Sequence, residues 1–291
     1  MYLEHYGLKK APFEMTPDPA FLYLGESHRE GLATLVYAIQ SGKGFAMLTG
    51  EVGTGKTTLL NALLGRLDAK TAAAYVFNPK LDTLDFFKIL FEELEIGGGC
   101  ATKADYLLSL NRFLIDRHEK DEPTLLILDE AQNLSTELLE EIRLLSNLET
   151  ASSKLIQIVL VGQPELAEIL SRPELRQLRQ RISLRHNLRP FNRAETADYI
   201  AQRLVRAGYV GPPLFRANAL RVVFDRTRGI PRLINALCDS SLLLGYSRYR
   251  SMLEAALVRE AADDLMLDGG AAPAAEVCPA SSKRRWFGLR R

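Results

Sequence analysis

The sequence predicts an α/β fold, in which a parallel β-sheet carries helices on both faces and a small all-helical unit follows. Short apolar runs alternate with helical patterns between residues 27 and 190, as a parallel sheet covered on both sides requires. One connection in this region, residues 50–57, matches the pattern G-x-x-x-x-G-K-[ST]. From residue 191 to residue 267 only helical patterns remain.

Composition excludes several classes of protein. The 291 residues hold 37 Lys and Arg against 36 Asp and Glu, so the formal net charge of +1 gives no global preference for nucleic acid or membrane. Cys100, Cys238 and Cys278 lack any C-x-x-C spacing, which favours free thiols over a zinc site or disulfides. No apolar run approaches the ~18 residues of a membrane helix, and the first ten residues lack a signal-peptide core, so we expect a cytoplasmic protein.

An amino-terminal arm is expected over residues 1–26. Three prolines between residues 12 and 19 exclude a helix there, and the side chains of Phe13, Phe21 and Tyr23 need a surface to pack on. Such an arm either walls an adenine pocket or only covers apolar core, and the sequence leaves both alternatives open.

The α/β domain is expected over residues 27–190 and begins with a helix. Ser27 and Glu30 have the spacing of an S-x-x-E capping box, and apolar residues then recur at helical spacing until Gly42. His28 falls in the first turn of this helix. We expect it to be an exposed residue without a catalytic role, because nothing in the sequence pairs it with a nucleophile.

The glycine-rich loop after the strand expected at residues 45–48 predicts a triphosphate site. Glycines let backbone N–H groups turn inward around an anion, and the helix that begins near Lys56 adds the positive end of its dipole. We expect Lys56 to reach the β- and γ-phosphates and the Thr57 hydroxyl to ligate Mg²⁺. The residues expected to bind the nucleotide are Gly50, Glu51, Val52, Gly53, Thr54, Gly55, Lys56, Thr57 and Thr58.

Two carboxylates follow the strand expected at residues 124–128. A buried parallel strand tolerates acids only where it emerges at its carboxyl end, and ligands bind at that edge of open α/β sheets. Asp129 would hold the magnesium ion through its water shell, and Glu130 would polarise the water that attacks the γ-phosphate. Coming after the glycine-rich loop, this pair predicts nucleotide hydrolysis.

Another polar side chain, Gln163, follows the strand expected at residues 155–161. At the tip of that strand its amide could contact the γ-phosphate or the attacking water, and the alternative is a loop amide bonded to backbone. A further strand is expected at residues 72–77. Amphipathic helices are expected over residues 82–94, 103–118 and 135–148.

Arginines are dense between residues 172 and 189. They favour either a nucleic-acid face or a finger that reaches a nucleotide held by a neighbouring subunit. Arg179 and Arg181 are the preferred finger candidates, because Arg181 directly precedes the strand-like residues 182–184. A solvated surface accounts for most of the other arginines.

A helical lid is expected over residues 191–267, with Asn192 and Glu195 as a capping pair. Arg232 falls in the first turn of its third helix, where the helix dipole opposes a cation, and a nearby anion would explain that placement. The four lid helices are expected near residues 193–207, 216–226, 232–244 and 253–266.

A flexible basic tail is expected over residues 268–291. Its first part is rich in Ala, Gly and Pro, and its end is basic and aromatic. That end either contacts an anionic membrane or a protein partner, or has no partner at all.

Taken in order, these motifs resemble the AAA+ ATPases, which are P-loop NTPases with a helical lid. The resemblance rests on the glycine-rich loop, the acids after residue 128, Gln163, the arginines near Arg181, and the G-I-P-R segment at residues 229–232. It implies that Arg232 is the sensor 2 arginine, which contacts the nucleotide phosphates from the lid. The catalytic residues expected on both grounds are Lys56, Glu130, Gln163, Arg179, Arg181 and Arg232.

More narrowly, the chain resembles the general secretion pathway protein A (ExeA/GspA) branch. The matching segments are Y-G-L at residues 6–8, T-P-D-P at 16–19, the G-E-V-G-T-G-K-T-T loop, D-E-A-Q-N-L at 129–134 and G-Q-P-E-L at 162–166. The resemblance implies a Mg²⁺-dependent ATPase, using ATP and Mg²⁺, that assembles with itself as a ring or filament. It would help to build a secretion, pilus or polysaccharide-export machine of the bacterial envelope.

Two further expectations concern partners. The alternative function is an ATP-dependent DNA-binding regulator of the transposition type, which the arginine-rich segment permits and the neutral net charge does not support. The basic tail leaves open a peripheral location at the inner membrane.

Overall fold

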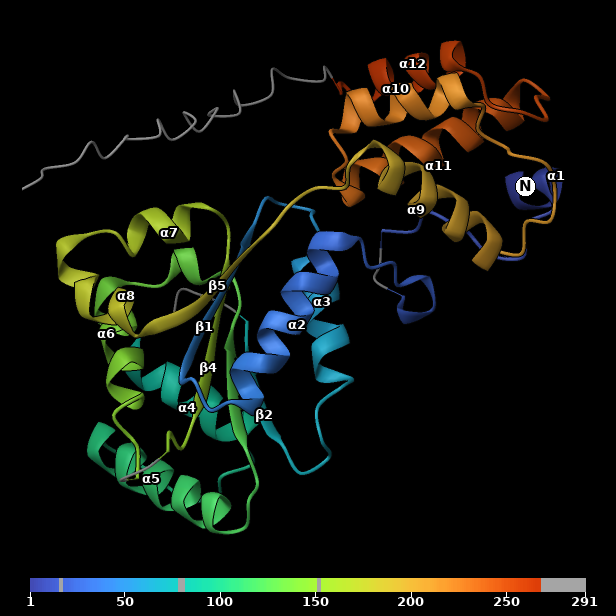
Figure 1. Cartoon of the computed structure of the whole chain (residues 1–291). Coiled ribbons are helices and arrows are strands. Elements are labelled where there is room, and N and C mark those ends of the chain that lie inside the picture. Colours follow the sequence, from blue (N-terminus) through green and yellow to red (C-terminus); the bar gives the residue numbers. More distant parts are fainter. Residues whose placement is uncertain (16–17, 78–81, 151–152, 268–291) are drawn as a thin grey trace, which may run out of the picture.

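The computed structural model in Figure 1 confirms the α/β fold followed by a helical unit. The predicted tail and Thr16 and Pro17 of the T-P-D-P segment lie outside the described residues. The residues described are 1–15, 18–77, 82–150 and 153–267. Within these ranges five parallel strands form the sheet, in the order β2-β3-β4-β1-β5. They are β1 (Phe45–Gly50), β2 (Ala72–Val76), β3 (Thr124–Leu128), β4 (Gln157–Gly162) and β5 (Ile182–Leu188).

Helices cover both faces of the sheet, because alternate side chains of the buried strands point to opposite faces. Ala46, Leu48 and Val159 pack with α2 and α3 on one face, and Met47 and Leu160 pack with α4, α5 and α6 on the other. The helices of this domain are α2 (Glu26–Gln40), α3 (Lys56–Leu64), α4 (Thr83–Glu93), α5 (Lys103–Glu119), α6 (Thr136–Leu145), α7 (Glu165–Ile169) and α8 (Arg176–Arg181).

The lid contains four helices, and the arm packs on it. Tyr6, Leu8, Phe13 and Phe21 of residues 1–26 share one apolar cluster with the lid. Phe13 is only 1% exposed, so the arm is a structural part of this cluster. The elements are the short arm helix α1 (Tyr2–Tyr6) and the lid helices α9 (Arg193–Arg206), α10 (Ala217–Thr227), α11 (Pro231–Ser247) and α12 (Ala255–Asp264).

One predicted helix cap is wrong. The N-cap of α2 is Gly25, and the hydroxyl of Ser27 accepts a hydrogen bond from the backbone N–H of Arg189 at 3.1 Å instead of capping the helix. A carboxylate from the lid takes over part of the capping, since Glu195 Oε1 accepts from the Glu26 N–H at 2.6 Å. The predicted capping box of Asn192 and Glu195 at the start of α9 is confirmed, so Glu195 serves helices of both the core and the lid.

Candidate active site

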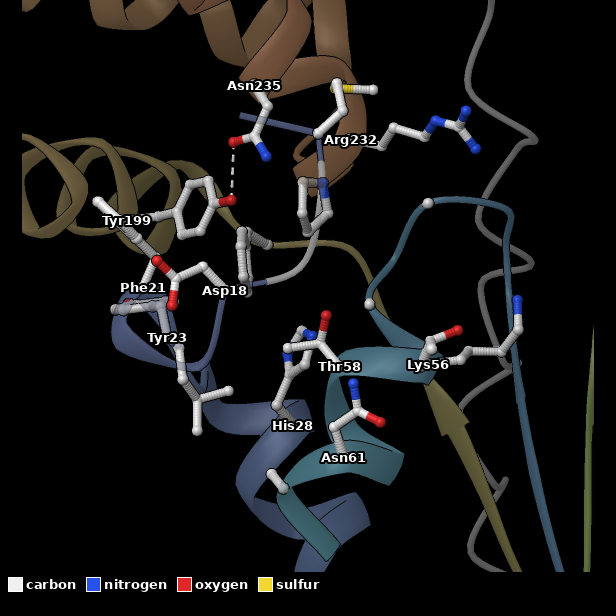
Figure 2. Close-up of a pocket in the computed structure, with 18 of the residues that line it drawn as sticks. Asp18, Phe21, Tyr23, His28, Lys56, Thr58, Asn61, Tyr199, Arg232 and Asn235 are labelled. Atoms are coloured by element: carbon white, nitrogen blue, oxygen red, sulfur yellow. Dashed lines mark hydrogen bonds between the residues drawn. The ribbon is translucent and has the colours of Figure 1, made fainter. Parts of the chain in front are cut away.

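A cavity of about 500 Å³ lies at the carboxyl edge of the sheet, between the glycine-rich loop, the arm and the lid. Parallel pairing places the ends of β1, β3 and β4 at this edge, with Thr49 opposite Gly162 and Leu128 opposite Leu160. Figure 2 shows Lys56 and Arg232 toward one side of the cavity and the rings of the arm and lid toward the other. The cavity therefore has a cationic end and an aromatic end.

The glycine-rich loop has the backbone that the motif requires. Gly53 and Gly55 have φ values of 79° and 101°, in the left-handed region that favours glycine. A Cβ on Gly53 would lie 2.7 Å from the Cβ of Arg232, so the lid packs directly against this glycine. The backbone N–H of Arg232 also donates to the Gly53 carbonyl at 3.2 Å, while its exposed side chain lines the cavity.

Lys56 begins helix α3, and its side chain turns back into the loop. Its Nζ donates to the Gly50 carbonyl at 2.7 Å and to the Glu51 carbonyl at 3.2 Å. Burial lowers the pKa of the Lys56 ammonium, and the carboxylates of Glu130 and Asp129 oppose that shift. A phosphate at the start of α3 would meet this ammonium and the helix dipole together.

The two acids after β3 differ in their surroundings. Asp129 is only 4% exposed, and its carboxylate accepts from the Tyr75 hydroxyl at 2.5 Å and from the Glu130 N–H at 2.8 Å. Burial, followed by the hydrogen bond to Asp129, raises the pKa of Tyr75. Glu130 itself has a φ of 52°, a left-handed backbone that is uncommon outside glycine and that aims its half-buried side chain into the cavity.

An amide that the sequence patterns did not reveal connects Glu130 with Gln163. Gln132 Nε2 donates to Glu130 Oε2 at 2.6 Å, and Gln132 Oε1 accepts from the Gln163 N–H at 3.0 Å. The Gln163 amide nitrogen lies 3.4 Å from the same Glu130 oxygen, so the structure brings these residues together. Gln132 belongs to the D-E-A-Q-N-L segment noted in the sequence, but no role could be assigned to it there because the contact depends on the turn formed by residues 131–133.

The expectation that His28 is exposed is wrong. This residue is 2% exposed, and its Nε2 lies 2.9 Å from the carbonyl oxygen of Thr54 in the glycine-rich loop. Burial lowers the pKa of the imidazole, so we expect a neutral ring at pH 7 whose Nε2–H donates to that carbonyl. The ring of Phe191 lies 5.0 Å away, and His28 thus supports the loop from the core side.

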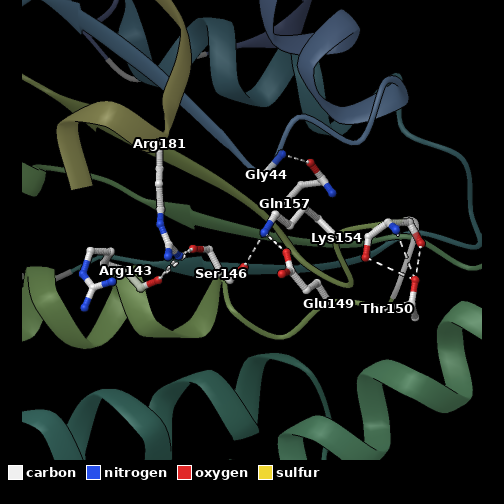
Figure 3. A network of polar contacts seen from close by, with 9 residues as sticks. Gly44, Arg143, Ser146, Glu149, Thr150, Lys154, Gln157 and Arg181 are labelled. Carbon is white, nitrogen blue, oxygen red and sulfur yellow. Dashed lines mark hydrogen bonds and ion pairs between the residues drawn. The ribbon is translucent and has the colours of Figure 1, made fainter. Parts of the chain in front are cut away.

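The arginine candidates lie at the other edge of the sheet. Arg179 and Arg181 precede β5, whereas the glycine-rich loop follows its parallel neighbour β1, so this chain does not bring them to its own cavity. Figure 3 shows Arg181 bonded to the carbonyl of Arg143, at 3.0 Å, and to the Ser146 hydroxyl. To reach a neighbouring subunit, Arg181 would first have to break both bonds.

The residues at the cationic end fit a magnesium triphosphate. The glycine cradle leaves no room for a Cβ at Gly53, and Thr57, Lys56 and Glu130 line the same cavity beside Asp129. Among the described residues, no group of three or more His, Cys, Asp or Glu side chains could hold a metal alone. Mg²⁺ takes few protein ligands and shares phosphate oxygens and waters, so Thr57 and Asp129 could serve as its protein partners.

Comparison with known proteins shows which family the chain is similar to. The family described as "AAA domain" matches residues 39–170. Over 249 residues the chain is 42% identical to General secretion pathway protein A of Aeromonas hydrophila. The chain therefore contains an AAA domain, and over most of its length it is similar to general secretion pathway protein A. The match covers 85% of this chain and 45% of that relative, so the chain spans about half of the relative's length.

Solved structures support the AAA+ fold at lower identity. Cdc6p from Pyrobaculum aerophilum superposes with a TM-score of 0.64 at 19% identity, over 86% of this chain and 71% of that one. The Aeropyrum pernix ORC2 protein, in ADPNP-ADP complexes, also has a TM-score of 0.64, at 20% identity, over 88% of this chain and 72% of its own. At these identities the likeness concerns the fold alone. Within the described ranges, every helix is too short or too polar to cross a membrane.

Proposed function

We propose that the chain is a Mg²⁺-dependent ATPase that hydrolyses ATP to drive assembly or remodelling of a bacterial envelope machine, such as a secretion, pilus or polysaccharide-export system. The hydrolysis part rests on one observation. The glycine cradle, Lys56 and Glu130 line one cavity beneath the lid, and the buried Asp129 lies directly beside Glu130, from whose N–H it accepts a hydrogen bond. The proposal that the protein acts on an envelope machine rests on the 42% identity to General secretion pathway protein A.

The chemistry of this chain's residues follows from their positions. Glu130 would accept a hydrogen bond from the attacking water and draw its proton, with Gln163 and Gln132 holding the carboxylate in place. Lys56 would leave the loop carbonyls to meet the β- and γ-phosphates, and Arg232 would approach them from the lid. Mg²⁺, held by Thr57 and through water by Asp129, would neutralise charge on the phosphate oxygens.

Self-assembly as a ring or filament is part of the proposal. Neither Arg179 nor Arg181 lines the cavity of its own chain, so either one, as an arginine finger, would act on the ATP of a neighbouring subunit. Such contacts would make hydrolysis in one subunit change its packing on the next. We further propose a cytoplasmic location, peripheral at the inner membrane.

A DNA-bound regulator is the second candidate. The observation in its favour is that four arginines of the 172–189 segment are exposed: Arg172, Arg176, Arg185 and Arg189. ATP-dependent affinity for DNA that falls steeply with salt, measured by filter binding, would favour this function over envelope assembly.

Replacing Lys56 by alanine should weaken ATP binding by at least about tenfold, because a buried ammonium facing the phosphates is lost. Fluorescence titration with a labelled ATP analogue in Mg²⁺ measures the effect. The control is Lys120→Ala, which removes an exposed lysine paired only with Asp116. Equal affinity in the Lys56→Ala and wild-type proteins would contradict the proposed phosphate site.

Replacing Gln132 by alanine should lower the turnover rate roughly tenfold, the value of one hydrogen bond to a charged group, while ATP affinity stays the same. The reason is that the Glu130 carboxylate loses the amide that fixes its orientation. Steady-state hydrolysis and equilibrium ATP binding, measured in parallel, separate the two effects. Asn133→Ala, at the exposed neighbouring position, should retain full turnover. A Gln132→Ala protein with normal turnover would exclude this positioning role.

A further inference from the structure

A buried cation lies at the aromatic end of the cavity. Arg203 of α9 is 7% exposed and lines the cavity. Among the described residues, no Asp or Glu forms an ion pair with its guanidinium. Burying a charge without a counter-charge is costly unless hydrogen bonds and a ligand satisfy it. This residue is therefore unlike the exposed, paired arginines elsewhere on the lid.

Part of this guanidinium holds the arm to the lid. Its Nε donates to the Pro12 carbonyl, and its Nη1 donates to the Tyr199 hydroxyl at 2.6 Å. The guanidinium carbon lies 5.0 Å from the centre of the Phe21 ring, which comes from the arm. One turn later Arg206 donates to the carbonyls of two further arm residues, Ala20 and Leu22. Arm and lid are thus joined through α9.

The remaining terminal nitrogen, Nη2, has no hydrogen-bond acceptor among the described residues. The neighbouring Tyr199 hydroxyl donates to Asn235 Oδ1 at 2.8 Å and accepts from Nη1 of Arg203, not from Nη2. In Figure 2, Tyr199 and Phe21 lie on the side of the cavity away from Lys56. With phosphates at Lys56, the base of a nucleotide would fall among these rings, which suit a flat aromatic group.

We propose that Arg203 is the base-reading residue of the site. Its Nη2 donates to a ring nitrogen of the adenine, while its other nitrogens hold the arm against the lid, so that the arm and lid close on the base together. This inference rests on the proposed ATPase function, and it adds that the base, not only the triphosphate, is sensed through Arg203.

The test compares ATP with tripolyphosphate, which has the phosphates and no base, by calorimetric titration of the full chain in Mg²⁺. Wild-type protein should bind ATP more tightly than tripolyphosphate. Arg203→Gln should weaken ATP binding by about tenfold or more, as expected for a charge-assisted hydrogen bond, and change tripolyphosphate binding less than about twofold. Arg203→Lys retains the charge, so its affinity for ATP should lie between those of the wild-type and Arg203→Gln proteins. Arg216→Gln, which alters an exposed arginine beside Glu254, should behave as wild type.

Three results would overturn the inference. The first is equal affinity of the wild-type protein for ATP and tripolyphosphate. The second is an Arg203→Gln protein that still prefers ATP to tripolyphosphate. The third is an Arg203→Lys protein whose affinities for ATP and for tripolyphosphate fall by the same factor. The first comparison needs no variant, so it stands even if Arg203→Gln fails to fold. A wild-type protein that binds neither ligand would instead contradict the proposed function itself, and the two failures are thereby distinguished.

Discussion

A Glu130→Gln protein is expected to bind ATP as tightly as the wild type and to lose nearly all turnover, by a factor of roughly 10² to 10⁴. The amide retains the shape of the side chain and can still bond to Gln132 and Gln163, but it cannot draw a proton from water. Phosphate release measured at saturating ATP reports turnover, and equilibrium titration reports affinity.

The matched control for this variant is Glu168→Gln. Glu168 is an exposed acid on α7, outside the cavity lining, so its replacement should leave both affinity and turnover unchanged. Substantial hydrolysis by Glu130→Gln would assign the base to another group. Loss of ATP binding would instead show that the carboxylate shapes the site before any chemistry occurs.

Replacing Gly229 by alanine should strongly destabilise the lid, although it adds only one methyl group. Its φ is 76°, and a Cβ would lie 1.8 Å from the backbone carbonyl oxygen of Phe191, which cannot move aside as a side chain could. The Phe191 N–H also donates to the Gly229 carbonyl at 2.9 Å, so relief of the overlap breaks this link between the start of the lid and the start of α11. We expect a loss above about 3 kcal/mol in the free energy of unfolding.

Gly42→Ala provides the control, because Gly42 has a similar φ of 61° with nothing within 4 Å of an added Cβ. The Gly42→Ala protein has the strain of a left-handed backbone without the overlap, so its free energy of unfolding should fall by roughly 1 to 2 kcal/mol. Urea unfolding monitored by circular dichroism compares the two variants. Equal losses would show that the Phe191 contact is unimportant and that backbone conformation alone matters.

Most of the fold could be predicted from the sequence, because the signals are local. Apolar periodicity placed four of the strands and the longer helices within a few residues of their observed ends, but it did not predict the short helices α1, α7 and α8. Asp82, Ser135 and Asn192 were correctly placed at the starts of helices, each with a side chain that accepts from the helix backbone. The glycine-rich loop was identifiable because its backbone conformation requires glycine.

The residues that were missed depend on contacts between distant parts of the chain. His28 is buried by Thr54 and Phe191, and no pattern around His28 encodes those partners. Gln132 acquires its role only because β3 and β4 pair in parallel and bring Gln163 beside it. The Ser27 capping pattern was misleading, since a carboxylate from the lid already serves the start of α2.

The central claim is that this cavity binds ATP with Mg²⁺ through the glycine cradle and the acids after β3. Isothermal titration of the purified full chain with ATP in excess Mg²⁺ tests it most directly. We expect saturable binding of one ATP per chain, weakened when EDTA removes the metal. Titration to millimolar ATP without saturable heat, from a protein shown to be folded, would contradict the account.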